Sequence, residues 1–232
     1  MVKATQGDVG RFTGFGSKAL PFFEALKFHQ DKAWFEENRG LYESDVLDPM
    51  IALVDDLTAD FARRKIPLRG DGKRSIFRLN RDVRFSKDKS PYKTHAGAVL
   101  TRSGAKKDPG LLYIHIDPTG CFAAAGFYRP EAPALAAFRK AMLASPQKAK
   151  ALLGRLDKAD LALGTFDQLT RVPRGFEALK DGPLDGLVRM KSLVVQKDLA
   201  SESITRPGLA EEIIDFAERA RPLLDFGWQA VD

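Results

Sequence analysis

The stretch THAGAVLTRSGAKKDPGLLYIHIDPTGCFAAAGFY, residues 94 to 128, decides the fold. It contains three short apolar or alternating runs, at 94–102, 110–117 and 121–128, separated by the turn compositions SGAKKDP and PTG. Connections of seven and three residues are too short for a parallel crossover. We therefore expect these runs to form neighbouring antiparallel strands.

Helical periodicity flanks this stretch on both sides. Apolar residues recur at helical spacing between 17 and 64, where Asp31 suits an N-cap and Pro49 suits the first turn of a helix. Beyond Pro130 the segments EAPALAAFRKAMLAS, PQKAKALLGRLDKA and PGLAEEIIDFAERARPLLDF have the same spacing. The sequence predicts an α+β fold in which N-terminal and C-terminal helices cover an antiparallel sheet, with strands near 76–85, 94–102, 110–117, 121–128 and 190–198.

Length and composition favour one domain. A chain of 232 residues with 44% hydrophobic content is long enough for one substantial core. We expect a single α+β domain over 10–232, with 1–9 as a flexible N-terminus. No window has the 18 or so consecutive apolar residues of a membrane helix, and the start, MVKATQGDVGRF, has no apolar run typical of a signal peptide. We expect a cytoplasmic protein with no membrane partner.

The cysteine count limits disulfides and metal sites. Cys121 is the only cysteine, so the chain forms no intramolecular disulfide and no multi-cysteine metal site. We expect a reduced, buried thiol.

Positive charge is concentrated in one segment. Residues 63–107 contain fifteen Lys or Arg against three Asp, a net charge of +12. The rest of the chain carries 22 basic and 28 acidic residues, a net charge of −6. Such asymmetry indicates an anionic partner, although a solvated basic surface is the alternative.

The densest part of this segment is IFRLNRDVRFSKDKSPYK, residues 76–93. As a strand, 76–85 would place Phe77, Leu79, Val83 and Phe85 on one face together with Arg81. Because an unpaired buried charge costs several kcal/mol, Arg81 would then need a carboxylate or a bound anion. Arginine forks and nearby lysines suit a phosphate or a carboxylate group. We predict that an anionic small ligand binds at Arg78, Arg81, Asp82, Arg84, Asp88, Lys89, Tyr92 and Lys93.

A resemblance to a known family rests on this motif. The pattern Arg78-x-x-Arg81-Asp82-x-Arg84-Phe85-x-x-Asp88-Lys89-x-x-Tyr92 resembles the signature of a mainly bacterial family called domain of unknown function 2461. WFEENRGLY (34–42), AGFYRP (125–130) and VPRGF (172–176) are also similar to that family, so the resemblance extends from about residue 13 onward. The family has no established activity, so the resemblance implies a centre of interest at 78–92 and no particular chemistry.

Catalysis and metal binding find weaker support. Asp82, His95 and Tyr92 are candidate acid–base groups, but no motif pairs a nucleophile with a base, and whether the protein is an enzyme stays open. If Arg102 faces Leu111, the numbers of facing residues sum to 213, and His95 comes to the end of the sheet that carries His115 and Asp117. That register points His95 to the opposite face. We therefore predict no metal site and no cofactor.

Three functions remain open. The first is binding of a phosphate- or carboxylate-bearing ligand, either by a binding domain or by an enzyme that acts on it. The second is nucleic-acid binding along 63–107, although few aromatic side chains are placed for base stacking there. The third is a structural or interaction domain in which Asp82 and Asp88 pair with neighbouring arginines and lysines as an internal network.

Overall fold

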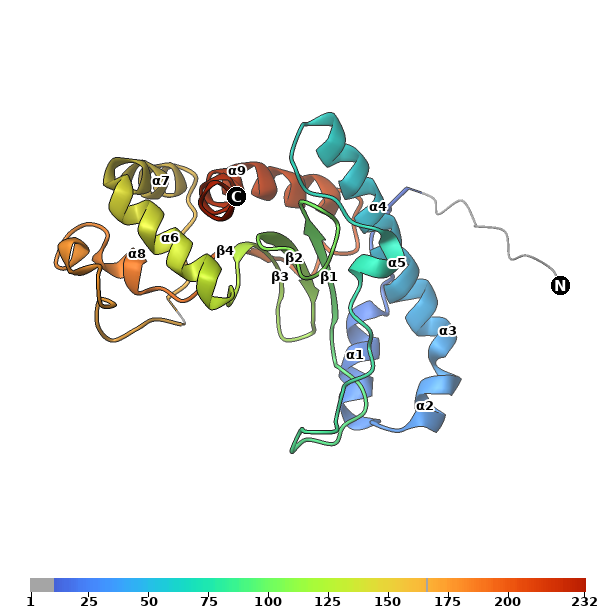
Figure 1. Cartoon of the computed structure of the whole chain (residues 1–232). Helices are drawn as coiled ribbons and strands as arrows, with labels where there is room; N and C mark the ends of the chain where they lie inside the picture. Colours follow the sequence, from blue (N-terminus) through green and yellow to red (C-terminus); the bar gives the residue numbers. More distant parts are fainter. Residues whose placement is uncertain (1–10, 166) are drawn as a thin grey trace.

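Four antiparallel strands form a sheet at the centre of the molecule (Figure 1). The computed structural model describes residues 11–165 and 167–232, so the predicted flexible segment 1–9 lies outside the described residues. Within that part of the chain the strands lie side by side in sequence order: β1 (Ala96–Thr101), β2 (Leu111–Ile116), β3 (Cys121–Phe127) and β4 (Leu193–Leu199). The predicted α+β class and antiparallel sheet are confirmed.

An N-terminal group of helices lies beside β1. It comprises α1 (Ala19–Phe28), α2 (Lys32–Glu37), α3 (Arg39–Tyr42), the π-helical turn η1 (Glu43–Leu47), α4 (Asp48–Arg63) and the short α5 (Gly72–Ser75). Asp31 caps α2 as predicted, because its Oδ1 accepts a hydrogen bond from the Trp34 N–H at 2.8 Å. Pro49 lies in the first turn of α4, also as predicted.

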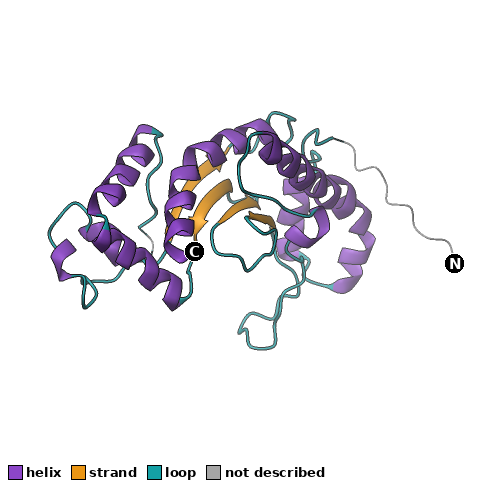
Figure 2. Cartoon of the chain, turned by 45° about the horizontal axis from the view of Figure 1, so that its top comes forward, coloured by secondary structure: helices purple, strands orange, loops and turns teal. Residues whose placement is uncertain are grey.

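The C-terminal half adds a second group of helices on the far side of the sheet and one long helix that packs on it. The group contains α6 (Ala132–Ala144), α7 (Pro146–Lys158), the 3-10 turn η2 (Glu177–Leu179) and α8 (Asp185–Arg189). The long helix, α9 (Leu209–Val231), contacts β3 and β4, and Figure 2 shows helices flanking the sheet on both sides.

The two faces of the sheet differ in chemistry. One face carries apolar side chains that enter the main core, such as Leu100, Ile114 and Ala123, and it also holds the free, buried Cys121. The other face carries Tyr113, His115 and Phe122, which are half-buried. Because side chains alternate along a strand, this second face presents polar and aromatic groups beside the basic loops.

The predicted strand at 76–85 is wrong. Ile76 forms an isolated bridge with Ala98, and Asn80 forms one with Tyr92, but the segment makes no continuous ladder. The chain leaves β1 after Phe77, whose N–H donates to the Gly97 carbonyl, and pairs with 91–93 instead. Asp82 and Asp88 then accept hydrogen bonds from backbone N–H groups two residues ahead, and such turns compete with strand pairing.

The predicted faces of 76–85 are therefore wrong as well. Leu79 is buried, but so is Ile76, which strand alternation would place on the face opposite to Leu79. Phe85 is 95% exposed and Phe77 is 36% exposed.

No described helix is both long and apolar enough to cross a membrane.

Helix α9 docks on β3 through a glycine. A Cβ at Gly227 would lie 2.1 Å from the Phe127 ring, which is itself buried and packs edge-to-face against Phe138 at 4.8 Å. We predict that Gly227→Ala lowers the free energy of unfolding by about 1–3 kcal/mol, because the Phe127 ring must move in a close-packed core. Urea unfolding followed by circular dichroism measures this.

Gly154→Ala is the matched control, because Gly154 is also helical and has no neighbouring atom within 4 Å of an added Cβ. There the higher helix propensity of alanine stabilises by up to about 1 kcal/mol. Equal stabilisation by both substitutions would contradict the close packing of α9 on β3.

Candidate functional site

The charged side chains of loop 81–90 bind mostly to one another. The Arg84 guanidinium donates to Asp82 through Nε and NH2 at 3.0 and 2.7 Å, and the Arg81 guanidinium pairs with Asp88. Lys89 Nζ donates to the Val83 carbonyl at 3.0 Å. Arg81 thus finds a carboxylate, as its residue type demands, but on the surface of a loop and not in the core.

These ion pairs depress the pKa of both carboxyl groups. The pKa of Asp88 lies well below its ordinary value, chiefly because Arg81 donates to it and because the Ser90 hydroxyl and N–H also donate. The hydrogen bonds from Arg84 likewise lower the pKa of Asp82. Both carboxylates are ionised at neutral pH and neutralise the two arginines that the motif places beside them.

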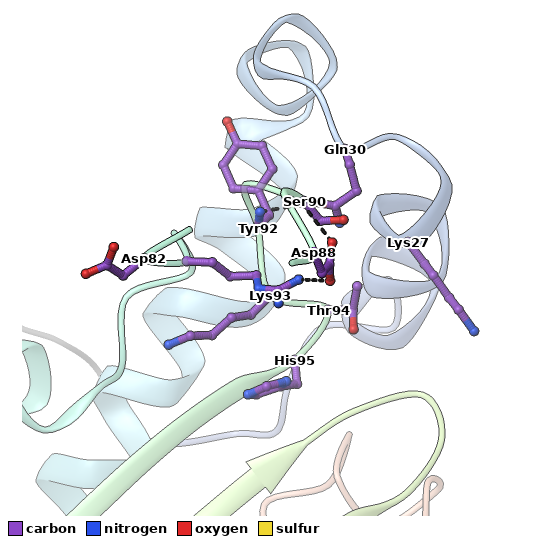
Figure 3. Close-up of a pocket in the computed structure, with 10 residues that line it drawn as sticks. Lys27, Gln30, Asp82, Asp88, Ser90, Tyr92, Lys93, Thr94 and His95 are labelled. Carbon is purple, nitrogen blue, oxygen red and sulfur yellow. Dashed lines mark hydrogen bonds and ion pairs between the residues drawn. The ribbon is translucent and has the colours of Figure 1, made fainter. Parts of the chain in front are cut away.

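A cleft of about 590 Å³ opens between the end of α1, loop 81–90 and the approach to β1 (Figure 3). Gln30 fixes one wall, because its Oε1 accepts a hydrogen bond from the Tyr92 N–H at 3.0 Å. The volume is within the usual range for small-molecule sites. The lining residues are Lys27, Gln30, Arg81, Asp82, Asp88, Ser90, Tyr92, Lys93, Thr94 and His95.

The structure separates the predicted ligand-binding residues. Arg81, Asp82, Asp88, Tyr92 and Lys93 line this cleft. The other three do not: Arg84 and Lys89 are exposed on the loop, and Arg78 lines a second cleft of about 470 Å³ beside α2 and α4.

The three candidate acid–base side chains point in different directions. The Tyr92 ring stacks on Phe35 at 4.7 Å, and Figure 3 shows its hydroxyl pointing away from Lys93 and His95. Asp82 also points away from these two residues. The His95 ring points to the same side as the Lys93 side chain. Burial lowers the pKa of His95, and the charge of Lys93 lowers it further.

Three neighbouring cations, of which Lys93 lines the cleft, have no carboxylate partner among the described residues. Among the described residues, no Asp or Glu oxygen lies within 4.0 Å of the charged nitrogens of Arg78, Lys93 or Lys106. Lys93 Nζ donates to the Arg78 carbonyl at 2.8 Å, and Lys106 Nζ donates to the Ile76 carbonyl at 2.5 Å. Their Nζ atoms lie 5.5 and 4.8 Å from the centre of the Phe77 ring.

Burial and neighbouring positive charges lower the pKa of both lysines. Burial lowers the pKa of Lys93, and the charges of Lys106 and Arg78 lower it further. Burial and Arg78 lower the pKa of Lys106 in the same way. The sequence analysis did not include Lys106 in the site, because only the folded chain brings the 102–110 connection next to Phe77.

A second cluster lies next to the cleft, where β1 begins and β2 ends. The observed register pairs Ala96 with Ile116 and Thr101 with Leu111, so that facing residue numbers sum to 212 and not 213. A shift of one residue turns every side chain to the other face. The prediction that His95 points away from His115 and Asp117 is therefore wrong.

The three side chains converge on one another. Asp117 Oδ2 lies 4.0 Å from His95 Nδ1 and 3.7 Å from His115 Nε2, and the two imidazole rings are 4.6 Å apart. Burial lowers the pKa of His115 to about 4 and also lowers that of His95, so both rings are neutral at pH 7. Imidazole nitrogens and a carboxylate oxygen that converge in this way are suited to bind a metal ion.

The Arg81–Asp88 pair makes a testable prediction. We expect the Asp88 carboxyl to titrate below the ordinary aspartate pKa, and Arg81→Gln to raise that pKa without restoring it fully, because the hydrogen bonds from Ser90 remain. Carboxyl carbon chemical shifts measured against pH report this directly. The Asp82 carboxyl is the internal control, since its lowered pKa depends on Arg84 and Arg78. An ordinary pKa for Asp88 in the unmodified protein would contradict the pairing.

Comparison with known proteins places the chain in a family. Neither the curated proteins nor the solved structures showed a significant match to it. A model of the family described as "Conserved hypothetical protein (DUF2461)" matches residues 18–226. That range includes the arginine motif, the cleft and the His95 cluster. The chain therefore belongs to the DUF2461 family of conserved hypothetical proteins.

Proposed function

We propose that the protein binds a small ligand bearing a phosphate or carboxylate group at the Lys93 end of the 590 Å³ cleft. The observation that carries this proposal is the group of cations without carboxylate partners, Arg78, Lys93 and Lys106, within the described residues. Burial is the main cause of the lowered pKa of both lysines, and neighbouring positive charge lowers it further; a bound anion would offset that charge. It would also gain charge-assisted hydrogen bonds in a partly desolvated setting.

This proposal moves the centre of the site along the motif. Arg84 and Asp82 satisfy each other on the exposed surface, so a ligand there would first have to break their pair. Lys93 already has its ammonium held by the Arg78 carbonyl, which leaves two further donor positions for a ligand. Arg78 and Lys106 then act through their charge, and Arg81 with Asp88 shapes the neighbouring wall.

His95 gives the proposal its possible chemistry. It lines the cleft and is neutral at pH 7, because burial lowers its pKa and the nearby Lys93 charge lowers that pKa further. A neutral imidazole beside a bound anion is suited to accept a proton from that ligand. Binding does not require this step, so binding is tested first.

The experiment is a thermal-melt series in the presence of EDTA, which removes contributions from metal ions. The ligands are phosphate, sulfate, nucleotides, sugar phosphates, dicarboxylates and a short oligonucleotide, at low and moderate salt. A ligand at 100 times its Kd stabilises the native state by about 2.7 kcal/mol, which raises the Tm by several degrees for a chain of this size. We expect a small anion to do so at both salt concentrations.

Two charge-removing variants locate the site. Lys93→Gln keeps a donor for the Arg78 carbonyl but removes the charge, and we expect it to weaken binding at least about tenfold, the loss of one charge-assisted hydrogen bond. Arg84→Gln is the matched control and should bind as the unmodified protein does. Equal binding by the unmodified protein and Lys93→Gln would contradict the proposal. Stabilisation by the oligonucleotide alone, with steep loss in salt, would favour nucleic-acid binding instead.

A further inference from the structure

We propose that His95, His115 and Asp117 bind a divalent transition-metal ion. The ligand atoms of these residues all lie within 4.8 Å of one another, at the end of the β1–β2 hairpin. Bonds of about 2.0–2.2 Å would bring tetrahedral ligand atoms to about 3.3–3.6 Å of one another. Asp117 Oδ2 already lies 3.7 and 4.0 Å from the two imidazole nitrogens, so small side-chain rotations close the site.

Hydrogen bonds from residues outside the cluster orient the side chains of His115 and Asp117. The Tyr113 hydroxyl bonds His115 Nδ1 at 2.9 Å, which leaves Nε2, the nitrogen that faces Asp117, as the ligand atom. The N–H and hydroxyl of Thr119 both donate to Asp117 Oδ1 at 2.7 Å, which leaves Oδ2 toward the histidines. Partners of this kind fix the ring tautomer and orient the ligands in metal sites.

The charge balance of the cluster also calls for a cation. The Asp117 side chain is only 14% exposed, and no described Lys or Arg nitrogen lies within 4.0 Å of its carboxylate. In the described chain, the ionisable nitrogens within 4.0 Å of it belong to His95 and His115. A bound dication would supply the counter-charge that no described lysine or arginine provides to this largely buried carboxylate.

The donor set selects the class of metal. Two imidazole nitrogens and one carboxylate oxygen suit Zn²⁺, Co²⁺ or Fe²⁺, whereas Mg²⁺ and Ca²⁺ prefer sites made of oxygen alone. Three protein ligands leave at least one coordination position for water or another ligand. His95 also lines the cleft, so the ion would lie at the cleft edge. The metal site nevertheless stands independently of the proposed anion, because Arg78, Lys93 and Lys106 would hold the anion and its binding does not require His95.

Cobalt binding to the purified protein without an affinity tag is the test. Visible absorption of bound Co²⁺ reports both affinity and coordination geometry. We expect one Co²⁺ per chain, displaced by Zn²⁺ and unaffected by Mg²⁺. Asp117→Asn and His95→Gln should each weaken binding by at least about a hundredfold, and Tyr113→Phe, which keeps all three ligands, by about tenfold.

The chain offers a matched control histidine. His29 is exposed, stacks on Trp34 at 5.1 Å and is not one of the three clustered residues, so His29→Gln should bind Co²⁺ as the unmodified protein does. Far-ultraviolet circular dichroism confirms that each variant is folded, and Tyr113→Phe keeps the test decisive if a ligand variant unfolds. Binding equally strong in Asp117→Asn, or no binding by the unmodified protein, would overturn the site.

Discussion

The register between β1 and β2 determines which side chains can act together. Because strand side chains alternate, pairing Ala96 with Ile116 sends Leu100 and Ile114 into the core and places His115 on the opposite face. The same pairing, continued by one residue, sets His95 opposite Asp117. A slip of one residue would expose the core face of one strand and separate the two histidines, so packing and the histidine cluster depend on one constraint.

The basic segment 63–107 serves two purposes in the fold. Part of its charge closes loop 81–90 on itself, through the Arg81–Asp88 and Arg84–Asp82 pairs. Another part, on Lys93 and Lys106, is held against backbone carbonyls near Phe77 without a neutralising carboxylate in the described chain. Exposed ion pairs contribute little net attraction for a further anion, whereas uncompensated, partly buried cations attract one strongly.

Much of the fold follows from local patterns. The three apolar runs with short turn-rich connections predicted the strands of the central hairpins, and Asp31 and Pro49 marked helix starts because capping and first-turn geometry are local effects. The segment 76–85 failed because alternation alone could not show that the chain leaves β1 after Phe77. There the side chains of Asp82 and Asp88 take over backbone hydrogen bonds that a strand would have needed.

The candidate site was less predictable than the fold, because it depends on contacts between distant segments. Arg78, Lys93 and His95 were identifiable from the motif and its surroundings, but Lys106 joins them only through the placement of the 102–110 connection. His115 and Asp117 were misplaced by a single residue of register, which no feature of the connection between the two strands specified. A one-residue error leaves the fold class unchanged but reverses a conclusion about chemistry.

The most direct test of the β1–β2 register and of the metal site is a crystal structure of the protein grown with Zn²⁺, with anomalous diffraction measured at the zinc edge. We expect Thr101 to pair with Leu111, and one anomalous peak to be bonded to His95 Nδ1, His115 Nε2 and Asp117 Oδ2. A hairpin shifted by one residue, with His95 on the face opposite His115, would contradict this expectation. So would a correctly paired hairpin whose histidines and Asp117 carry no anomalous peak.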